Sequence, residues 1–414
     1  MASLLAFARD NARWIGGGFL LTACSSFGQT FFVAQSSAEI RAEFGLSDGG
    51  FGFLYFLATL ASAASLPFLG RTLDHHPGHR VARFVVPALA ASCILLVLAP
   101  NVVLVGVALY GLRLFGQGMM SHIALTETGR WFAASRGRAT SLVVPGFQAG
   151  EFVLPTLFTL IAASLGWRWG WVLGAGLLML VVLPVVTRLL SVERIPRGET
   201  EGPDRTARDW TRAEVLRDPV FYALLAGVLA PPFIGTTVFF HQDHLTALRG
   251  YPEFAFPTAF SLMAVTTVTF ALVCGALVDR FGAIRLLPFF LLPLTVASLA
   301  VGYLDAAWGV YAFMVLFGVS YGFTSTLLGA LWPEVYGVKN LGGIRAIIVS
   351  AMVLSTALGP FVTGTLIDLG VELPQQMLGM AAWAAGGAAV MAFASRRLAA
   401  RRGWAEEAPV LSPG

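Results

Sequence analysis

The sequence predicts an all-α integral membrane protein whose twelve transmembrane helices form two similar six-helix halves. Of its 414 residues, 57% are hydrophobic and only 12% are charged, and the mean hydropathy is +0.75. Soluble domains carry about 25% charged residues. Apolar runs of about 20 residues, the length that crosses a bilayer, recur along almost the whole chain. A short charged turn occurs once in each half, which indicates an internal duplication.

The two charged turns lie at residues 70–80 and 275–285. Polar groups of this kind do not lie in hydrocarbon, so each turn marks a place where two helices meet water. The second turn resembles the cytoplasmic loop signature of the major facilitator superfamily (MFS), and the first is a looser copy with His75 in place of an arginine. The resemblance implies the MFS fold, and it implies a gating role for Gly70, Asp74, Arg80, Gly275, Asp279, Arg280, Gly282 and Arg285.

The apolar runs give the expected helices in order, with polar turns between them. A retained first anchor follows Arg9 and Arg13, and an outer loop at 37–48 follows that helix. The predicted domains are an N-terminal bundle at 1–190, a cytoplasmic linker at 191–218 and a C-terminal bundle with its tail at 219–414. We expect Pro231 and Pro232 to kink the seventh helix, because proline removes a backbone donor. The expected helices cover about 14–36, 50–69, 84–98, 102–125, 140–163, a sixth ending near 190, 219–240, 256–274, 286–303, 308–331, 344–367 and 376–394.

The basic residues report the orientation of the chain. If the N-terminus is cytoplasmic, every Lys and Arg falls on the cytoplasmic side except Arg41, Arg168 and Arg249 outside and Arg113 within a span. This asymmetry predicts a multi-pass protein of the inner (plasma) membrane with both termini inside. The basic residues form no patch for nucleic acid. Cys24, Cys93 and Cys274 all fall in spans and predict no disulfide framework.

Arg113 and Glu151 are the most informative positions. Each falls near the middle of its expected span, where a lone Arg or Asp costs roughly 2.5–3.5 kcal/mol on insertion scales. Intramembrane ionisable residues mark substrate or proton pathways by default. The two should lie at similar depth on neighbouring helices, which makes an ion pair geometrically plausible. Such a pair could couple a proton on Glu151 to a substrate anion on Arg113, or it could only tie two helices together.

Polar side chains surround these two positions. Gln117 is one turn after Arg113, and Gln148 is one turn before Glu151, each on the same helical face as its neighbour. Arg113 followed by Gly116 and Gly118 resembles the second MFS signature, whose arginine is linked with proton coupling. The resemblance also implies that the first, fourth, seventh and tenth helices line a central cavity. The expected substrate-binding residues are therefore Arg113, Gln117, Gln148, Gln29 and Tyr321, and the expected proton-coupling residues are Glu151 and Arg113.

The substrate class is predicted from a further resemblance. The run 332–337 with Leu341 and Gly342, then 357–360 and Asp368, resembles bacterial members near the monocarboxylate and oxalate/formate branch. This favours proton-coupled transport of a small organic anion by alternating access. Proton-driven efflux of an amphipathic drug-like compound is the alternative, and a membrane sensor or scaffold is a third possibility. Costly buried charges argue against a scaffold.

Enzymatic activity has no support in the sequence, because it contains no nucleotide loop and no nucleophile constellation. His241, Asp243 and His244 could imitate a metal site, although a wet polar outer loop is the commoner explanation. We expect no cofactor. The expected partners are the lipid bilayer, protons and a small-molecule substrate, and we expect a monomer.

Overall fold

The computed structural model describes residues 2–132, 135–192, 209–337 and 340–407, with the side chains of 2–5, 74, 136, 342 and 402–407 left out. Most of the predicted linker, at 193–208, therefore lies outside the described residues, as do the side chain of Asp74 and all of Lys339. The predicted domain boundaries at 190 and 219 stay a prediction.

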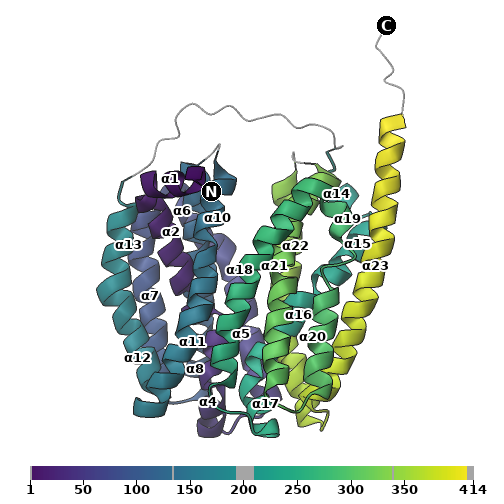
Figure 1. Cartoon of the computed structure of the whole chain (residues 1–414). Helices are drawn as coiled ribbons and strands as arrows, with labels where there is room; N and C mark the ends of the chain where they lie inside the picture. Colours follow the sequence, from purple (N-terminus) through teal and green to yellow (C-terminus); the bar gives the residue numbers. More distant parts are fainter. Residues whose placement is uncertain (1, 133–134, 193–208, 338–339, 408–414) are drawn as a thin grey trace. The chain divides into compact units, whose positions relative to one another are not determined.

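The described residues are helical and contain no strand, as the composition predicted (Figure 1). Ten helices among them are long and apolar enough to cross a membrane, and a shorter apolar helix covers Leu292–Tyr303. Hydrocarbon around a chain permits spanning segments only when their backbone hydrogen bonds are satisfied internally, which helices achieve. The predicted all-helical membrane fold is confirmed.

In the first half of the chain, several spanning segments are made of consecutive pieces. The pieces labelled η are short 3₁₀ turns (η1, η2) or π-helical stretches (η3, η4). Their bounds are α1 Ala2–Asp10, α2 Ala12–Cys24, η1 Ser25–Gly28, α3 Thr30–Val33, η2 Ala34–Ser36, α4 Ser37–Phe44, α5 Asp48–Gly70, α6 Thr72–His75, α7 Gly78–Leu98, α8 Val102–Gly111, η3 Leu112–Met120, α9 Ser121–Trp131, α10 Arg136–Val143, α11 Pro145–Leu165, α12 Trp167–Leu177, η4 Leu178–Val182 and α13 Leu183–Leu190.

The second half follows a similar plan. Its elements are α14 Arg212–Val215, α15 Pro219–Val228, α16 Ala230–Phe240, α17 Gln242–Arg249, α18 Ala255–Phe281, α19 Ala283–Leu286, α20 Leu292–Tyr303, α21 Trp308–Tyr336, α22 Leu341–Asp368 and α23 Leu373–Glu407.

Several expected boundaries need correction. The outer loop expected at 37–48 contains a helix, α4, and the polar loop after the seventh span is the helix α17. The ninth span begins at Leu292 and not at 286, because Pro288 and Pro293 interrupt the helix that α19 begins. The seventh span is interrupted at Leu229, two residues before Pro231, as predicted.

Contacts divide the chain into two compact units. Unit 1 contains Met1–Pro203, Thr236–Val265 and Thr356–Glu372, and unit 2 contains Asp204–Gly235, Thr266–Ser355 and Leu373–Gly414. Unit 1 thus joins the first half of the chain to the end segments of three later helices, α16, α18 and α22. In Figure 1, α4 and α17 lie at the end of unit 1 opposite to α1 and α10.

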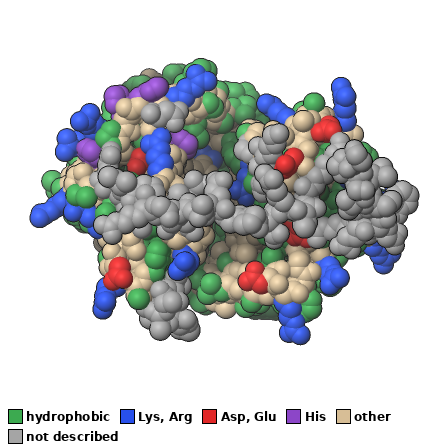
Figure 2. Space-filling view, turned by 90° about the horizontal axis from the view of Figure 1, so that it is seen from above, with side chains coloured by type: hydrophobic (Ala, Val, Ile, Leu, Met, Phe, Trp, Pro, Cys, Tyr) green, Lys and Arg blue, Asp and Glu red, His purple; other side chains and the backbone are tan. Residues whose placement is uncertain are grey.

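The three cysteines are free and buried. The face seen from above carries scattered Lys and Arg side chains (Figure 2), in keeping with basic residues spread over many short loops.

Candidate functional site

The first spanning segment is broken in its middle. Helix α2 ends at Cys24, the 3₁₀ turn η1 follows, and Gln29 is extended (φ −80°, ψ 152°) before helix α3 begins at Thr30. We call residues 25–29 the helix-1 break. A break inside a membrane span frees backbone carbonyls from the helical ladder, and such irregular backbone is tolerated where other protein groups satisfy it.

Arg113 satisfies one of these freed carbonyls. Its Nη1 donates a hydrogen bond to the Gly28 oxygen at 3.1 Å, and its guanidinium carbon lies 5.2 Å from the centre of the Tyr55 ring. The Tyr55 hydroxyl in turn lies 2.7 Å from Thr30 Oγ1, just past the break. A guanidinium over an aromatic face gains a cation–π attraction that is stronger when both groups are desolvated. Arg113 is 2% exposed, so this environment holds a charge out of water.

The local backbone of the fourth span suits this contact. Arg113 lies in the π-helix η3 (Leu112–Met120), and π-helical segments occur frequently at functional sites. Gly116 and Gly28 let the two segments touch. A Cβ on Gly28 would overlap the Leu112 oxygen and lie 2.5 Å from the Gln117 nitrogen. Only two glycines permit so close an approach of two backbones.

Helix α11 packs against the other side of the same break. A Cβ on Gly150 would overlap Ser26 Oγ and lie 2.7 Å from the Ala23 oxygen. The next residue, Glu151, is 9% exposed. The fourth and fifth spans therefore flank the helix-1 break, Arg113 on one and Glu151 on the other.

Three buried polar atoms around the break find no hydrogen-bond partner in the part of the chain that the structure describes. They are Ser26 Oγ, Arg113 Nε and Glu151 Oε2. Arg113 and Glu151 do not form the ion pair that was geometrically plausible, since the contacts described for Arg113 go to Gly28 and Tyr55. A buried polar atom without a partner is costly and calls for an explanation such as a ligand or an ordered water.

The other predicted binding residues are only partly brought to the break. Gln29 is part of the break, and the backbone nitrogen of Gln117 lies next to Gly28. Gln148 lies one turn before Glu151 on α11. Their side chains are half-buried. Tyr321 is a residue of unit 2, where its ring stacks on Phe317 at 5.6 Å.

Sequence reasoning missed Tyr55 and Gly28. Tyr55 is one of several aromatic residues in an apolar span, and nothing in its neighbourhood distinguishes it. Gly28 is one of 45 glycines, and its spacing from other glycines gives no pattern. Only the backbone break and the approach of η3 identify these two residues.

Each charged turn is held by a glutamate from a later helix of its own half. In the first half, the amide of Gly78 donates to Glu127 Oε1 at 3.1 Å, and Arg130 lies 3.4 Å from the same oxygen. In the second half, the amide of Ala283 donates to Glu334 Oε2 at 2.9 Å. A carboxylate at a helix N-terminus satisfies a free N–H and complements the helix dipole. The duplication inferred from sequence therefore extends to this capping contact.

The predicted gating residues lie near these caps. Gly282 has φ +80°, which favours glycine, and it lets the chain turn from α18 into α19. Gly70 ends α5, where a Cβ would lie 2.9 Å from His122 Nε2. The amide of Ala283, which begins α19, is bonded by Glu334. The remaining gating residues lie exposed or half-exposed along α7, α18 and α19: Arg80, Gly275, Asp279, Arg280 and Arg285.

Removing the second cap should weaken unit 2. Glu334→Ala leaves the Ala283 amide without its acceptor, and we expect a loss of about 1–3 kcal/mol in unfolding free energy. Glu334→Gln keeps an oxygen at that place and should lose less. Thermal unfolding of the purified protein in detergent measures both variants, and equal melting temperatures for Glu334→Ala and the unmodified protein would contradict this role.

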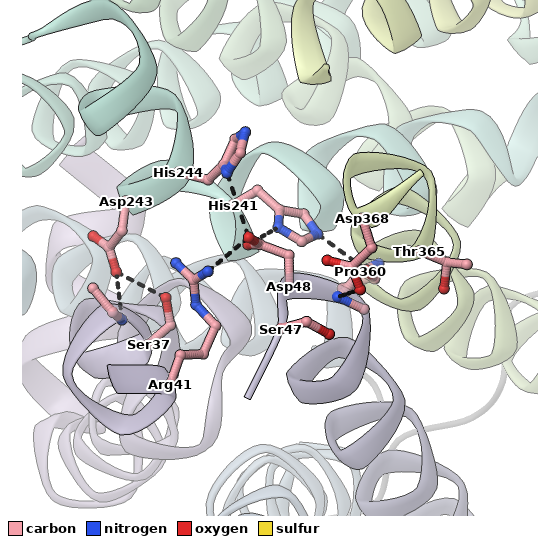
Figure 3. A network of polar contacts seen from close by, with 12 residues as sticks. Ser37, Arg41, Ser47, Asp48, His241, Asp243, His244, Pro360, Thr365 and Asp368 are labelled. Carbon is pink, nitrogen blue, oxygen red and sulfur yellow. Dashed lines mark hydrogen bonds and ion pairs between the residues drawn. The ribbon is translucent and has the colours of Figure 1, made fainter. Parts of the chain in front are cut away.

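At the opposite end of unit 1, five residues form a charged group that we call the Asp48 cluster: Arg41, Asp48, His241, His244 and Glu372. Figure 3 labels all of them except Glu372. Arg41 Nη1 lies 2.7 Å from Asp48 Oδ2, and Nδ1 of each histidine lies 3.4 Å from an oxygen of Asp48. The cluster thus joins α4 and α5 of the first half to α17 and the region after α22 of the second.

Two further contacts near the Asp48 cluster also link the first half of the chain to the second. The hydroxyl of Ser37 donates to Asp243 Oδ2 at 2.8 Å, and the amide of Gly49 donates to Asp368 Oδ2 at 3.0 Å. Burial raises the pKa of Asp243 to about 6, although the hydrogen bond from Ser37 opposes this shift. Asp243 therefore faces Ser37 and not the histidines. No group of three His, Cys, Asp or Glu side chains that could hold a metal ion occurs among the described residues.

Aromatic rings form a second layer of contact beneath the cluster. Phe51 stacks on Phe240 with ring centres 5.1 Å apart, and Phe31 lies 5.5 Å from Phe260. Phe361 contacts both Phe53 and Phe56. Four rings from the first half thus pack on three from the second inside unit 1. This aromatic layer buries apolar area without any charge.

A separate pocket of about 620 Å³ lies in unit 2 between the start of α15 and the end of α23. It contains Arg397 and Arg401 but none of the predicted site residues. Arg401 is already bound to Asp218, at 2.8 and 2.9 Å. The pocket is therefore not part of the helix-1 break.

The fold, its apolar spans and the buried charges define a multi-pass membrane transporter. The sequence model of the Major Facilitator Superfamily matches residues 18–360, and the chain belongs to this family. Its members are transporters and not enzymes.

Two solved structures of similar fold are of a bacterial homologue of the human lysosomal transporter Spinster in inward-facing conformations, one unoccupied and one occupied. Each is 16% identical to this chain, with a TM-score of 0.65. The match with the unoccupied structure covers 95% of this chain and 96% of that chain. The match with the occupied structure covers 97% of this chain and 98% of that chain. At this identity the likeness shows the fold alone.

Proposed function

We propose that the protein is a proton-coupled secondary transporter of a small organic anion, monocarboxylate-like in chemistry, and that it works by alternating access. The helix-1 break carries this proposal. There a buried guanidinium, a buried carboxyl group and a hydroxyl each leave an atom without a partner among the described residues. A carboxylate substrate would supply acceptors to Arg113, because guanidinium and carboxylate form strong charge-assisted pairs.

Glu151 has the second role in this proposal. It lies on the other side of the break from Arg113, so a proton and an anion can reach neighbouring groups without direct contact between the two side chains. When Glu151 is neutral, the break keeps the positive charge of Arg113 and attracts an anion. Ionisation of Glu151 cancels that attraction across the break, which couples proton release to release of the substrate.

The two ends of the transporter would be gated differently. We propose that the charged turns at residues 70–80 and 275–285 face the cytoplasm, as the distribution of basic residues predicts. The Asp48 cluster then faces the outside. Its contacts between the two halves of the chain would close the outer end.

The test uses proteoliposomes with an imposed pH gradient and two sets of labelled solutes, small carboxylates and lipophilic cations. We expect gradient-driven accumulation of a carboxylate. In Glu151→Gln, which keeps the size of the side chain but cannot ionise, accumulation should be lost while exchange of labelled for unlabelled solute without a gradient continues. Accumulation of cations alone would replace the proposal with drug efflux, and unchanged accumulation in Glu151→Gln would remove this residue from coupling.

A further inference from the structure

Each histidine of the Asp48 cluster lies between two hydrogen-bond acceptors. For His241, Nδ1 lies 3.4 Å from Asp48 Oδ1 and Nε2 lies 3.0 Å from the Pro360 carbonyl oxygen. For His244, Nδ1 lies 3.4 Å from Asp48 Oδ2 and Nε2 lies 2.8 Å from Glu372 Oε2. In both rings one partner comes from the first half of the chain and the other from the segment at residues 356–372. Figure 3 shows both partners of His241.

This arrangement suits only one protonation state. A neutral imidazole has one N–H donor and one nitrogen lone pair, whereas an imidazolium has two donors. With a neutral ring, one nitrogen lone pair of each histidine would face an oxygen lone pair. With a charged ring, every contact in the two bridges has a donor and an acceptor.

The surrounding charges favour the same state. Asp48 is paired with one permanent cation, Arg41, and Glu372 lies against His244. A charged His244 ring would place a second cation between these two carboxylates. Asp243 and Glu39 lie on the neighbouring surfaces, and burial raises the pKa of both.

The position of His244 gives it access to protons. The side chain of Glu372, the partner of His244, is partly exposed, whereas the side chain of His241 is buried. The hydrogen bond to Asp48, together with that to Glu372, raises the pKa of His244 against the opposing effect of burial.

We propose that His244 is a proton-binding residue that, together with its neighbour His241, holds the Asp48 end of unit 1 closed, so that acidity on the side it faces favours the closed form. The inference deepens the proposed function, because it assumes that this end opens during transport. The sign follows from linkage. The contacts of the closed form raise the pKa of His244, so closure is fully favoured below the pKa that His244 has in the open form and is lost as the pH rises through its pKa in the closed form. Asp243 adds to this in the same direction.

The experiment measures the distance across the joint in the full-length protein. Spin labels are placed on Ala42→Cys in α4 and Ala247→Cys in α17, two exposed positions of unit 1. The three native cysteines, all buried, are replaced by serine or alanine. Pulsed EPR in lipid nanodiscs without substrate then follows the distance between pH 5 and 9. The short-distance population should fall as the pH rises, with an open-to-closed ratio that changes by up to about tenfold per pH unit for the proton of His244.

Two variants and a matched control decide the origin of the effect. The double variant His241→Gln/His244→Gln should lose the pH dependence. His244→Arg keeps a cation at position 244 at every pH, so the Asp48 end of this variant should stay closed to higher pH. This measurement remains informative if the double variant folds poorly. His76→Gln changes an exposed histidine at the other end of unit 1 and should leave the response unchanged.

The outcomes separate this inference from the proposed function. The histidine assignment is overturned if the distance in the wild-type protein does not depend on pH. It is also overturned if the pH response survives in the double variant and is unaltered in His244→Arg. Either result would count against the histidines even if carboxylate transport is found. A histidine-dependent response in a protein that accumulates no carboxylate keeps the assignment and removes the proposed substrate.

Discussion

Arg113→Ala is expected to weaken binding of the anionic solute by at least about 100-fold. The loss of a charge-assisted pair costs about 1.5–3 kcal/mol for each hydrogen bond, and every 1.4 kcal/mol is tenfold in affinity. Arg113→Lys keeps the charge but not the planar fork and should recover only part of the affinity. Equilibrium binding of the carboxylate identified by the transport screen, measured on purified protein, gives both values.

Folding must be separated from binding in this comparison, because Arg113 also bonds to Gly28 and lies over Tyr55. Tyr55→Phe is the matched control: it keeps the ring beneath the guanidinium and loses only the hydroxyl that faces Thr30. We expect Tyr55→Phe to lower affinity far less than Arg113→Ala. If Arg113→Ala keeps a wild-type melting temperature and still takes up the solute, Arg113 does not bind the substrate.

Gly28→Val is expected to abolish the folded transporter or to lower its yield severely. The new side chain would overlap the Leu112 carbonyl and approach backbone atoms of Gly116 and Gln117. Overpacking costs typically about 1–3 kcal/mol and occasionally more, and backbone atoms cannot turn aside as a side chain can. Expression and size-exclusion chromatography in detergent provide the measurement.

Gly176→Ala is the control for that result. Gly176 is also a helical glycine of unit 1, but a Cβ there meets nothing within 4 Å. Alanine in a helix is more stable than glycine by about 0.5–1 kcal/mol, so this variant should express at least as well as the original protein. A monodisperse Gly28→Val protein with wild-type transport would show that the contact between η3 and the helix-1 break is not needed.

The spans could be predicted from sequence because hydrocarbon imposes a length and an apolar composition on them. The interruption of the seventh span was also predictable, since Pro231 and Pro232 remove backbone donors. The break at 25–29 was not. Ser25, Ser26 and Gly28 all occur in intact membrane helices, and what breaks the helix here is the packing of Gly116 and Gly150 against it.

The site was partly predictable for a similar reason. The cost of a charge in hydrocarbon singled out Arg113 and Glu151, which both flank the break. Their partners could not be found in this way, because the sequence carries no sign of the π-helix that aims Arg113 at Gly28. The histidines after the seventh span were noticed as a polar group. Asp48, which gives them their arrangement, lies far away in the chain, and only the tertiary structure brings it to them.

The aromatic layer beneath the Asp48 cluster has a thermal consequence. Opening this end would expose the buried rings of Phe51 and Phe240 to water. Hydration of apolar surface raises the heat capacity, so the enthalpy of opening must grow with temperature. The balance between the two forms should therefore follow a curve with a temperature of maximum closure, and both cooling and warming away from that temperature should favour the open form.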